Sequence, residues 1–243
     1  MSSQWVDYEA DGEAMRGYHV SVDGQSRGAV LVVPEAPGLG PMPQRRANML
    51  GELGYDAFVV DLYGDALFTG YGEVARPLMD KMMSTPGLLL ERVRCGLHAL
   101  RTLSTAPPER QFAIGYCLGG TGVLELARSG ADVAGVAAFH GILQPLSSVE
   151  PSGAMPKILV CIGRCDPLIP IEQATAFTEE MERASANYQL LLMGSGVGHA
   201  FTNPDIVGER KVPGFGFDEI ADARAWQALQ NFIEEPKAKA GTA

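Results

Sequence analysis

Residues 115–120 read Gly115-Tyr116-Cys117-Leu118-Gly119-Gly120, and this stretch decides the fold class. The apolar run at residues 111–115 predicts a strand before it, and the pattern from residue 118 to about 128 predicts a helix after it. This is the nucleophile-elbow pattern G-x-S-x-G, with Cys117 in the serine position. The flanking glycines suit a very tight turn, and a helix N-terminus favours a thiolate. The alternative reading is a glycine-rich turn around a buried, inert cysteine.

Strand and helix patterns alternate through the rest of the chain, and several strands are continuous apolar runs typical of strands buried on both faces. The expected strands are 27–33, 56–61, 111–115, 133–139, 157–163 and 188–193, and the expected helices are 44–53, 73–103 (in two pieces, broken near Pro86 and Gly87), 118 to about 128, 171–183 and 218–233. Such alternation predicts an α/β fold: a mostly parallel sheet with helices on both faces.

The sequence predicts one domain over residues 1–243. Residues 6–23 are expected to add antiparallel edge strands, and the polar tail 235–243 is expected to fray. In a parallel sheet of this kind the chemistry lies in the loops at the carboxyl ends of the strands, so those loops are where functional residues are sought.

Composition excludes several classes of function. The chain of 243 residues carries a net charge of -10, which argues against a general nucleic-acid binder and against binding to an anionic membrane surface. No apolar run approaches the roughly 18 residues of a membrane span, and the polar N-terminus lacks the features of a secretory signal, so we expect a cytoplasmic protein. The four cysteines form no C-x-x-C pair and the four histidines are dispersed, so neither a metal nor a cofactor is expected.

In chains with a nucleophile elbow, an acidic residue and then a histidine are expected in the loops after later strands. Asp166 follows the strand expected at 157–163, and His199 follows the strand expected at 188–193. Taken singly, an Asp-Pro pair is usually a turn and a loop histidine is usually a surface residue. Their order predicts a triad in which His199 takes the proton of Cys117 and Asp166 orients His199.

The loop after the first long strand reads Pro34-Glu35-Ala36-Pro37-Gly38. Such a loop supplies one oxyanion donor, and because proline has no N–H, the N–H of Ala36 is the expected one. The N–H of Leu118 is expected to be the second donor. For Glu35 the alternative is a carboxylate that points to solvent.

These motifs resemble those of the dienelactone hydrolase (carboxymethylenebutenolidase) family, within the α/β-hydrolase fold. The resemblance covers about residues 18–233 and rests on Pro34-Glu35-Ala36, Asp61-Leu62-Tyr63-Gly64, the cysteine elbow, Asp166-Pro167 and Gly198-His199-Ala200-Phe201. It implies a Cys117, His199 and Asp166 triad. It also implies that Glu35 takes part in activating the cysteine, which rests as a thiol and ionises when substrate displaces the carboxylate.

The sequence departs from the family in its anchors for a substrate carboxylate. Family members that act on dienelactone use two arginines, and Arg76 lies in about the right stretch for the first. The second should follow the histidine, where this chain has Thr202-Asn203-Pro204. A lost bidentate arginine contact indicates a neutral ester or a different lactone as substrate. Arg76, Tyr116, His140 and Asn203 are the candidates for substrate binding, and His140 is equally well explained as a structural histidine.

We therefore expect a hydrolase that cleaves a small carboxylic ester or lactone through an acyl-thioester intermediate. The alternatives are a thioesterase or an acyl transferase with the same triad, a binding protein that uses the elbow pocket without turnover, and a redox-sensing thiol at Cys117. The expected partner is a small-molecule substrate, with neither nucleic acid nor membrane. The sequence leaves the oligomeric state open between monomer and dimer.

Overall fold

The structure, a computed structural model, describes residues 1–146, 155–206 and 212–235. The strands are β1 (Ser2–Ala10), β2 (Glu13–Ser21), β3 (Ala29–Val33), β4 (Asp56–Val59), β5 (Gln111–Tyr116), β6 (Gly135–Phe139), β7 (Lys157–Gly163) and β8 (Tyr188–Met193). The helices are α1 (Pro41–Glu52), α2 (Ala75–Ser84), α3 (Leu88–Leu103), the short 3-10 helix η1 (Pro108–Arg110), α4 (Leu118–Arg128), α5 (Ile171–Arg183) and α6 (Glu219–Glu234).

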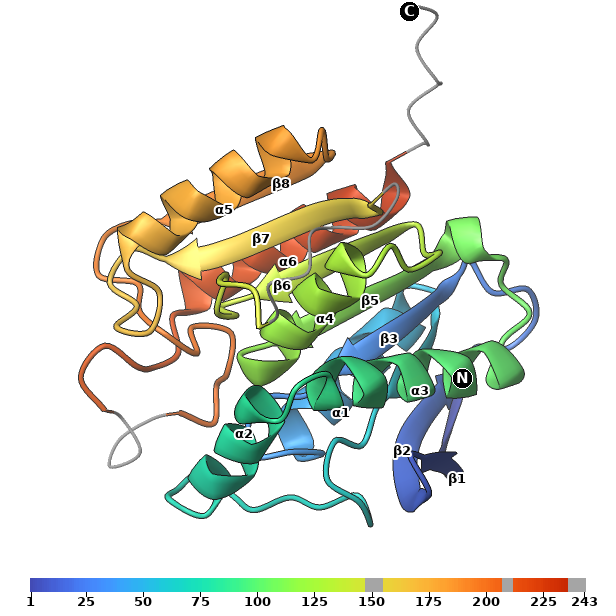
Figure 1. Ribbon diagram of the computed structural model, residues 1–243. Helices are drawn as coiled ribbons and strands as arrows, with labels where there is room; N and C mark the ends of the chain where they lie inside the picture. The colour runs from blue at the N-terminus through green and yellow to red at the C-terminus, as the bar shows by residue number, and fades with distance from the viewer. Residues whose placement is uncertain (147–154, 207–211, 236–243) are drawn as a thin grey trace, which may run out of the picture.

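One sheet forms the middle layer, with the strand order β1-β2-β4-β3-β5-β6-β7-β8 (Figure 1). The strands from β4 to β8 run parallel, so their carboxyl ends meet at one edge of the sheet. Only the β1–β2 hairpin is antiparallel, both within itself and where β2 joins β4. The predicted α/β fold with a mostly parallel sheet is confirmed.

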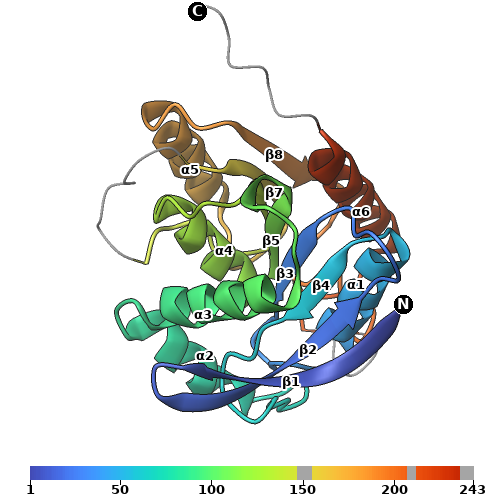
Figure 2. The same cartoon turned by 90° about the vertical axis from the view of Figure 1, so that its right-hand side faces the viewer.

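Helices cover both faces of the sheet, with α2, α3, α4 and α5 on one side and α1 and α6 on the other (Figure 2). Alternate residues of β3 show the consequence. Leu31 packs into the core beneath α3 and α4, whereas Val30 and Val32 pack into the core beneath α1 and α6. All five residues of β3 are buried, which explains why its sequence is a continuous apolar run instead of an alternating one.

Most predicted boundaries lie within two residues of those in the structure, and α5, β7 and β8 match. The clearest difference is α1, which begins at Pro41 and not at residue 44. Proline suits the first helical position because that position's N–H has no partner within the helix. The hairpin also starts earlier than expected, at Ser2. Of the tail expected to fray, residues 236–243 lie outside the described part of the chain.

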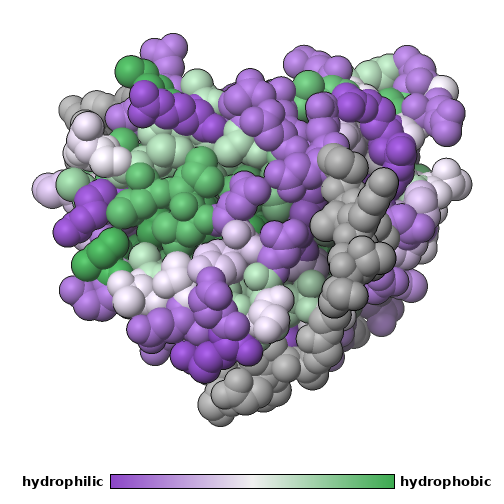
Figure 3. Space-filling model, turned by 90° about the horizontal axis from the view of Figure 1, so that it is seen from above, coloured by the Kyte–Doolittle hydropathy of each residue, from purple (hydrophilic) through white to green (hydrophobic). Residues whose placement is uncertain are grey.

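The two edges of the sheet differ in character. Strand β1 carries the charged residues Asp7 and Glu9, whereas none of the six residues of β8 is charged. Leu192 in β8 is 42% exposed, and its neighbours Leu190 and Leu191 are half-buried. Figure 3 shows an apolar patch on the face of the molecule that lies uppermost in Figure 1, where α5 and β8 are found.

Candidate active site

Cys117 stands between β5 and α4 in a strained backbone conformation, with φ 51° and ψ -114°. The turn leaves no room for side chains on its neighbours. A Cβ on Gly115 would meet the carbonyl oxygen of Gly119 at 2.0 Å, and a Cβ on Gly119 would meet the carbonyl oxygen of Val33 at 2.2 Å. The glycines of the elbow are therefore required by the close approach of backbone to backbone, and the half-buried Cys117 is presented at the start of α4.

His199 lies in the loop after β8 and is almost fully buried. Its Nδ1 donates to Oδ2 of Asp166 at 2.8 Å, and Oδ1 of Asp166 accepts the N–H of Leu168 at 2.9 Å. The other ring nitrogen, Nε2, is buried and has no nitrogen or oxygen partner within the described residues. The Cys117 side chain is close enough to act on the charge of His199.

The charge on His199 follows from these neighbours. Burial alone disfavours the imidazolium and lowers the pKa. The attraction of Cys117 and the hydrogen bond to Asp166 oppose burial and outweigh it, so that the pKa of His199 rises from 6.5 to about 10. At neutral pH this places a positive charge on His199, beside the sulfur of Cys117.

Two backbone N–H groups border the elbow. Those of Leu118 and Ala36 make no hydrogen bond with the described part of the chain. The Ala36 loop is held from its other side, since the Ala36 carbonyl accepts the Tyr63 hydroxyl at 2.8 Å and the N–H of Gly38 donates to the Glu35 carbonyl at 2.9 Å. Neither N–H is therefore occupied by a partner in the described part of the chain.

Glu35 does not point to solvent, because it is only 4% exposed. Its Oε1 accepts a hydrogen bond from Nδ2 of Asn203 at 2.5 Å, and the Tyr71 hydroxyl is its second hydrogen-bonding partner. Burial raises the pKa of Glu35 to about 7, although both hydrogen bonds and the charge of His199 act in the opposite direction. Glu35 forms no hydrogen bond to Cys117.

His140 lies behind the elbow and is completely buried. The N–H of Cys117 donates to Nδ1 of His140 at 3.2 Å, so the proton of the ring is on Nε2, which is 2.8 Å from Oγ1 of Thr202. Burial, together with the charges of His199 and Arg46, holds the pKa of His140 well below its usual value. This neutral ring supports the backbone of Cys117, in keeping with the structural alternative.

Two of the substrate-binding candidates lie elsewhere. Arg76 is on the exposed surface of α2, 3.5 Å from Asp80. Tyr116 is buried in the core and stacks on Phe139 with ring centroids 4.9 Å apart. Asn203 is brought into the site, where it holds Glu35.

Tyr71 and Thr202 also lie at the site, and no motif in the sequence predicts either residue. Tyr71 follows β4 in Gly70-Tyr71-Gly72, and its only sequence signal is that it occupies a loop at the carboxyl end of a strand. Thr202 lies three residues after His199, and nothing in its sequence context marks it as the partner of His140.

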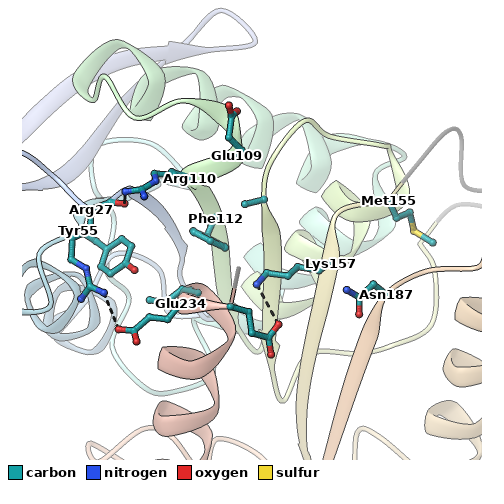
Figure 4. Close-up of a pocket in the computed structure, with 12 residues that line it drawn as sticks. Arg27, Tyr55, Glu109, Arg110, Phe112, Met155, Lys157, Asn187 and Glu234 are labelled. Carbon is teal, nitrogen blue, oxygen red and sulfur yellow. Dashed lines mark hydrogen bonds and ion pairs between the residues drawn. The ribbon is translucent and has the colours of Figure 1, made fainter. Parts of the chain in front are cut away.

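A large pocket of about 970 Å³ lies at the opposite end of the sheet, where the parallel strands begin (Figure 4). Of its three cations, Arg27 pairs with Glu234 at 3.0 Å, Lys157 pairs with Glu235 at 3.4 Å, and Arg110 donates to the Arg27 carbonyl at 3.1 Å. It contains none of the predicted site residues and is not the candidate active site.

Within the described residues, no three histidine, cysteine, aspartate or glutamate side chains gather as a ligand set for a metal. Over those same residues no helix combines the length and the apolar character that crossing a bilayer requires.

Comparison with known proteins relates the chain to one family. The model of the Dienelactone hydrolase family matches residues 15–236. The crystal structure of a dienelactone hydrolase-like promiscuous phosphotriesterase from metagenomic libraries is 31% identical, covers 96% of this chain and 97% of its own, and superimposes with a TM-score of 0.87.

Two curated relatives also match. A probable 2-oxo-3-(5-oxofuran-2-ylidene)propanoate lactonase from Bradyrhizobium sp is 26% identical over 83% of this chain and 84% of its own. An uncharacterized protein from Caenorhabditis elegans is 30% identical over 61% of this chain and 94% of its own. The chain belongs to the dienelactone hydrolase family and is a hydrolase of ester or lactone bonds.

Proposed function

We propose that the protein hydrolyses small carboxylic esters or lactones, with Cys117 as nucleophile, His199 as general base and acid, and Asp166 as the residue that orients His199. One observation carries the proposal. The ring of His199 is held by Asp166 through Nδ1, while Nε2 is left without a nitrogen or oxygen partner among the described residues and the Cys117 side chain is close enough to act on the pKa of His199. A nucleophile, a base and an orienting acid in this order make up the minimum apparatus for acyl transfer.

In the first half of the reaction, Sγ of Cys117 attacks the carbonyl carbon of the substrate. The N–H groups of Leu118 and Ala36 donate to the oxygen that becomes negative. When the tetrahedral centre collapses, the carbon–oxygen bond of the ester breaks and His199 gives its proton to the departing alkoxide. An acyl thioester on Cys117 remains.

In the second half, His199 removes a proton from water, and the hydroxide attacks the thioester carbonyl. The carbon–sulfur bond breaks, the acid product leaves, and the Cys117–His199 pair regains its starting charge. Glu35 has a proposed part in activating Cys117.

The charges around the site favour an uncharged substrate. The position after Thr202 is the neutral Asn203, and the nearby arginines already have partners, Arg45 with Asp205 at 3.3 Å and Arg46 with Asp222. Among the described residues, a carboxylate on the substrate would meet the carboxylate of Glu35 and no unpaired lysine or arginine at this position. Neutral lactones and esters belong first in the substrate panel, followed by neutral phosphotriesters because of the activity named for the metagenomic relative.

The test compares hydrolysis of p-nitrophenyl acetate by wild type, Cys117→Ala and Cys95→Ala, the last being a cysteine of α3 remote from the elbow. We expect kcat to fall by about 10³-fold or more in Cys117→Ala, since the acyl enzyme cannot form, and to stay near wild type in Cys95→Ala. Matched circular dichroism spectra establish that all three are folded. Turnover that persists in Cys117→Ala overturns the proposal.

A further inference from the structure

Glu35 is a buried carboxylate without a cationic partner. It is 4% exposed and forms no ion pair with any lysine or arginine of the described residues. Asp205, which acts on Glu35 through space, is paired with Arg45, so that guanidinium is occupied. Burying an unpaired carboxylate costs free energy, so its hydrogen-bond donors and the neighbouring charges that it acts on are candidates for a functional role.

Two neutral donors hold Glu35. Nδ2 of Asn203 lies 2.5 Å from Oε1 of Glu35 and 2.9 Å from the Tyr71 hydroxyl, and Tyr71 also bonds to Glu35. The orientation of the Asn203 amide is fixed from the other side, because its Oδ1 accepts the N–H of Asp205 at 2.9 Å. Since that oxygen must face an N–H, the NH2 group must face Glu35.

The charge of Glu35 acts on His199, and the attraction between them is one of the causes that lower the pKa of Glu35. His199 is therefore flanked by two carboxylates, Asp166 through a hydrogen bond and Glu35 through space. The other titratable groups around Glu35 are Tyr71, Tyr116 and Asp205, and the negative charge of Asp205 disfavours the ionised form of Glu35. His140, whose ring centroid lies 5.0 Å from that of His199, stays neutral.

We propose that Tyr71 and Asn203 are positioning residues that keep Glu35 on their own hydrogen bonds, where its charge stabilises the imidazolium of His199 instead of accepting the proton of Cys117. The inference rests on the roles proposed above for Cys117 and His199. It assigns to Glu35 an electrostatic part in the activation of Cys117. It follows that the sulfur is reactive in the resting enzyme, before any substrate arrives.

The experiment measures the initial rate of alkylation of Cys117 by iodoacetamide from pH 5 to pH 9, without substrate. The four cysteines fall in separate tryptic peptides, 95–101, 111–128, 158–164 and 165–183, so mass spectrometry of peptide 111–128 reports Cys117 alone. Wild type is compared with Tyr71→Phe, Asn203→Asp and Glu35→Gln. Tyr18→Phe is the control, because its hydroxyl lies 3.2 Å from the amide oxygen of Asn48, away from the site.

We expect wild-type Cys117 to react at rest, with a rate that rises with pH as Glu35 ionises near pH 7. We call the rising part of this pH–rate curve its acid limb. Tyr71→Phe removes a hydrogen bond that lowers the pKa of Glu35, so the acid limb should move to higher pH by about one unit. Asn203→Asp keeps the oxygen that accepts the Asp205 N–H but replaces the donor, and should move the limb further. Glu35→Gln should abolish the limb, and Tyr18→Phe should overlay wild type.

A structural defect alone would lower the rate at every pH, whereas the proposal requires rates at pH 9 within about twofold of wild type for Tyr71→Phe. Profiles of Tyr71→Phe and Asn203→Asp that superimpose on wild type overturn the inference, and so does a resting Cys117 that alkylates only after a substrate analogue is added. Because alkylation needs no turnover, failure to hydrolyse any ester contradicts the proposed function and leaves the test of Glu35 intact.

Discussion

At the scale of single residues, Cys117 combines the sulfur proposed as the nucleophile with a backbone conformation that suits glycine. Its φ of 51° with ψ of -114° lies outside the regions that residues with a Cβ prefer. Strain of this kind costs of the order of 1–3 kcal/mol and is retained only where the surroundings enforce it. Here the hydrogen bond from the Cys117 N–H to His140 and the glycine packing of the elbow do so.

Cys117→Gly is therefore expected to be more stable than Cys117→Ala, which keeps the strain, and the proposed role of Cys117 predicts that both are inactive. The gain should be about 1 kcal/mol, or roughly 2–4 °C in Tm for a chain of this size. Differential scanning calorimetry of the two variants at one pH measures it. Equal melting temperatures would show that the elbow is not strained.

The raised pKa of Glu35 predicts that the stability of wild type, relative to Glu35→Gln, depends on pH. The pKa of Glu35 is about 7 in the folded protein and 4.5 in the reference state, so folding disfavours its ionised form. The group's favourable contribution is fully present below pH 4.5 and is lost as the pH rises through 7. Compared with Glu35→Gln, wild type should lose stability between pH 5 and pH 8, by up to the order of 3 kcal/mol. Thermal melts of both proteins at the two pH values test this, and a pH-independent difference contradicts it.

At the scale of elements, α4 approaches the sheet through glycines. A Cβ on Gly119 would meet the backbone of Val33, which is fixed in the sheet. A Cβ on Gly122 would meet the ends of the Val93 and Leu89 side chains, at 3.1 Å and beyond. The two glycines lie one turn apart on the same helix, so they form a matched pair.

Gly119→Ala is expected to destabilise the protein by about 1–3 kcal/mol through overpacking, and to lower kcat because the elbow shifts. Gly122→Ala should lie within about 1 kcal/mol of wild type, since flexible side chains yield and alanine is the better helix former. Urea unfolding of the two variants makes the comparison. Equal losses in both would contradict the account of a backbone-limited approach.

The elements were largely predictable because buried parallel strands and amphipathic helices leave clear periodic signals. Strand β7 and helix α5 were placed at their correct bounds for this reason. Helix α1 was started too late because Pro41 was assigned to the loop, although proline is compatible with a first turn. The order of elbow, acid and histidine could likewise be foreseen, since each follows a strand whose end is fixed by the sheet.

The partners of Glu35 could not be foreseen. Tyr71 and Asn203 come from loops whose course is set by packing and not by any repeating pattern, and their meeting depends on how the loops after β4 and β8 cross. The motif spacing places Arg76 near the site, but α2 carries its side chain on an exposed surface. Loop geometry is thus where prediction from the sequence ended.

At the scale of the whole molecule, Arg46 of α1 ties the second helical layer to the site. It is buried, pairs with Asp222 of α6, donates to the carbonyl of Thr202 at 2.8 Å and lies over the ring of Trp226. The hydroxyl of the same Thr202 is 2.8 Å from His140. One buried cation therefore connects two helices with the support of the elbow.

Arg46→Met is expected to cost about 3–5 kcal/mol, because it leaves Asp222 without its cation, and to reduce kcat through the displaced Thr202. Arg16→Met is the comparison, since its pair with Asp7 is exposed and screened by solvent, so its loss should leave the melting temperature close to that of wild type. Melting temperatures and kinetics of both variants test the connection. A melting temperature for Arg46→Met that matches wild type would rule it out.

The two edge strands of the sheet differ in charge, and this difference limits how copies of the protein can associate edge to edge. An uncharged strand such as β8 can accept another strand along its free side, whereas β1, at the far edge, carries charges that resist such an addition. A pairing of β8 with β8 of a second copy would therefore be self-terminating. It uses up the receptive edge of each molecule and leaves two guarded ends, so the geometry permits a finite pair and opposes an open-ended fibre.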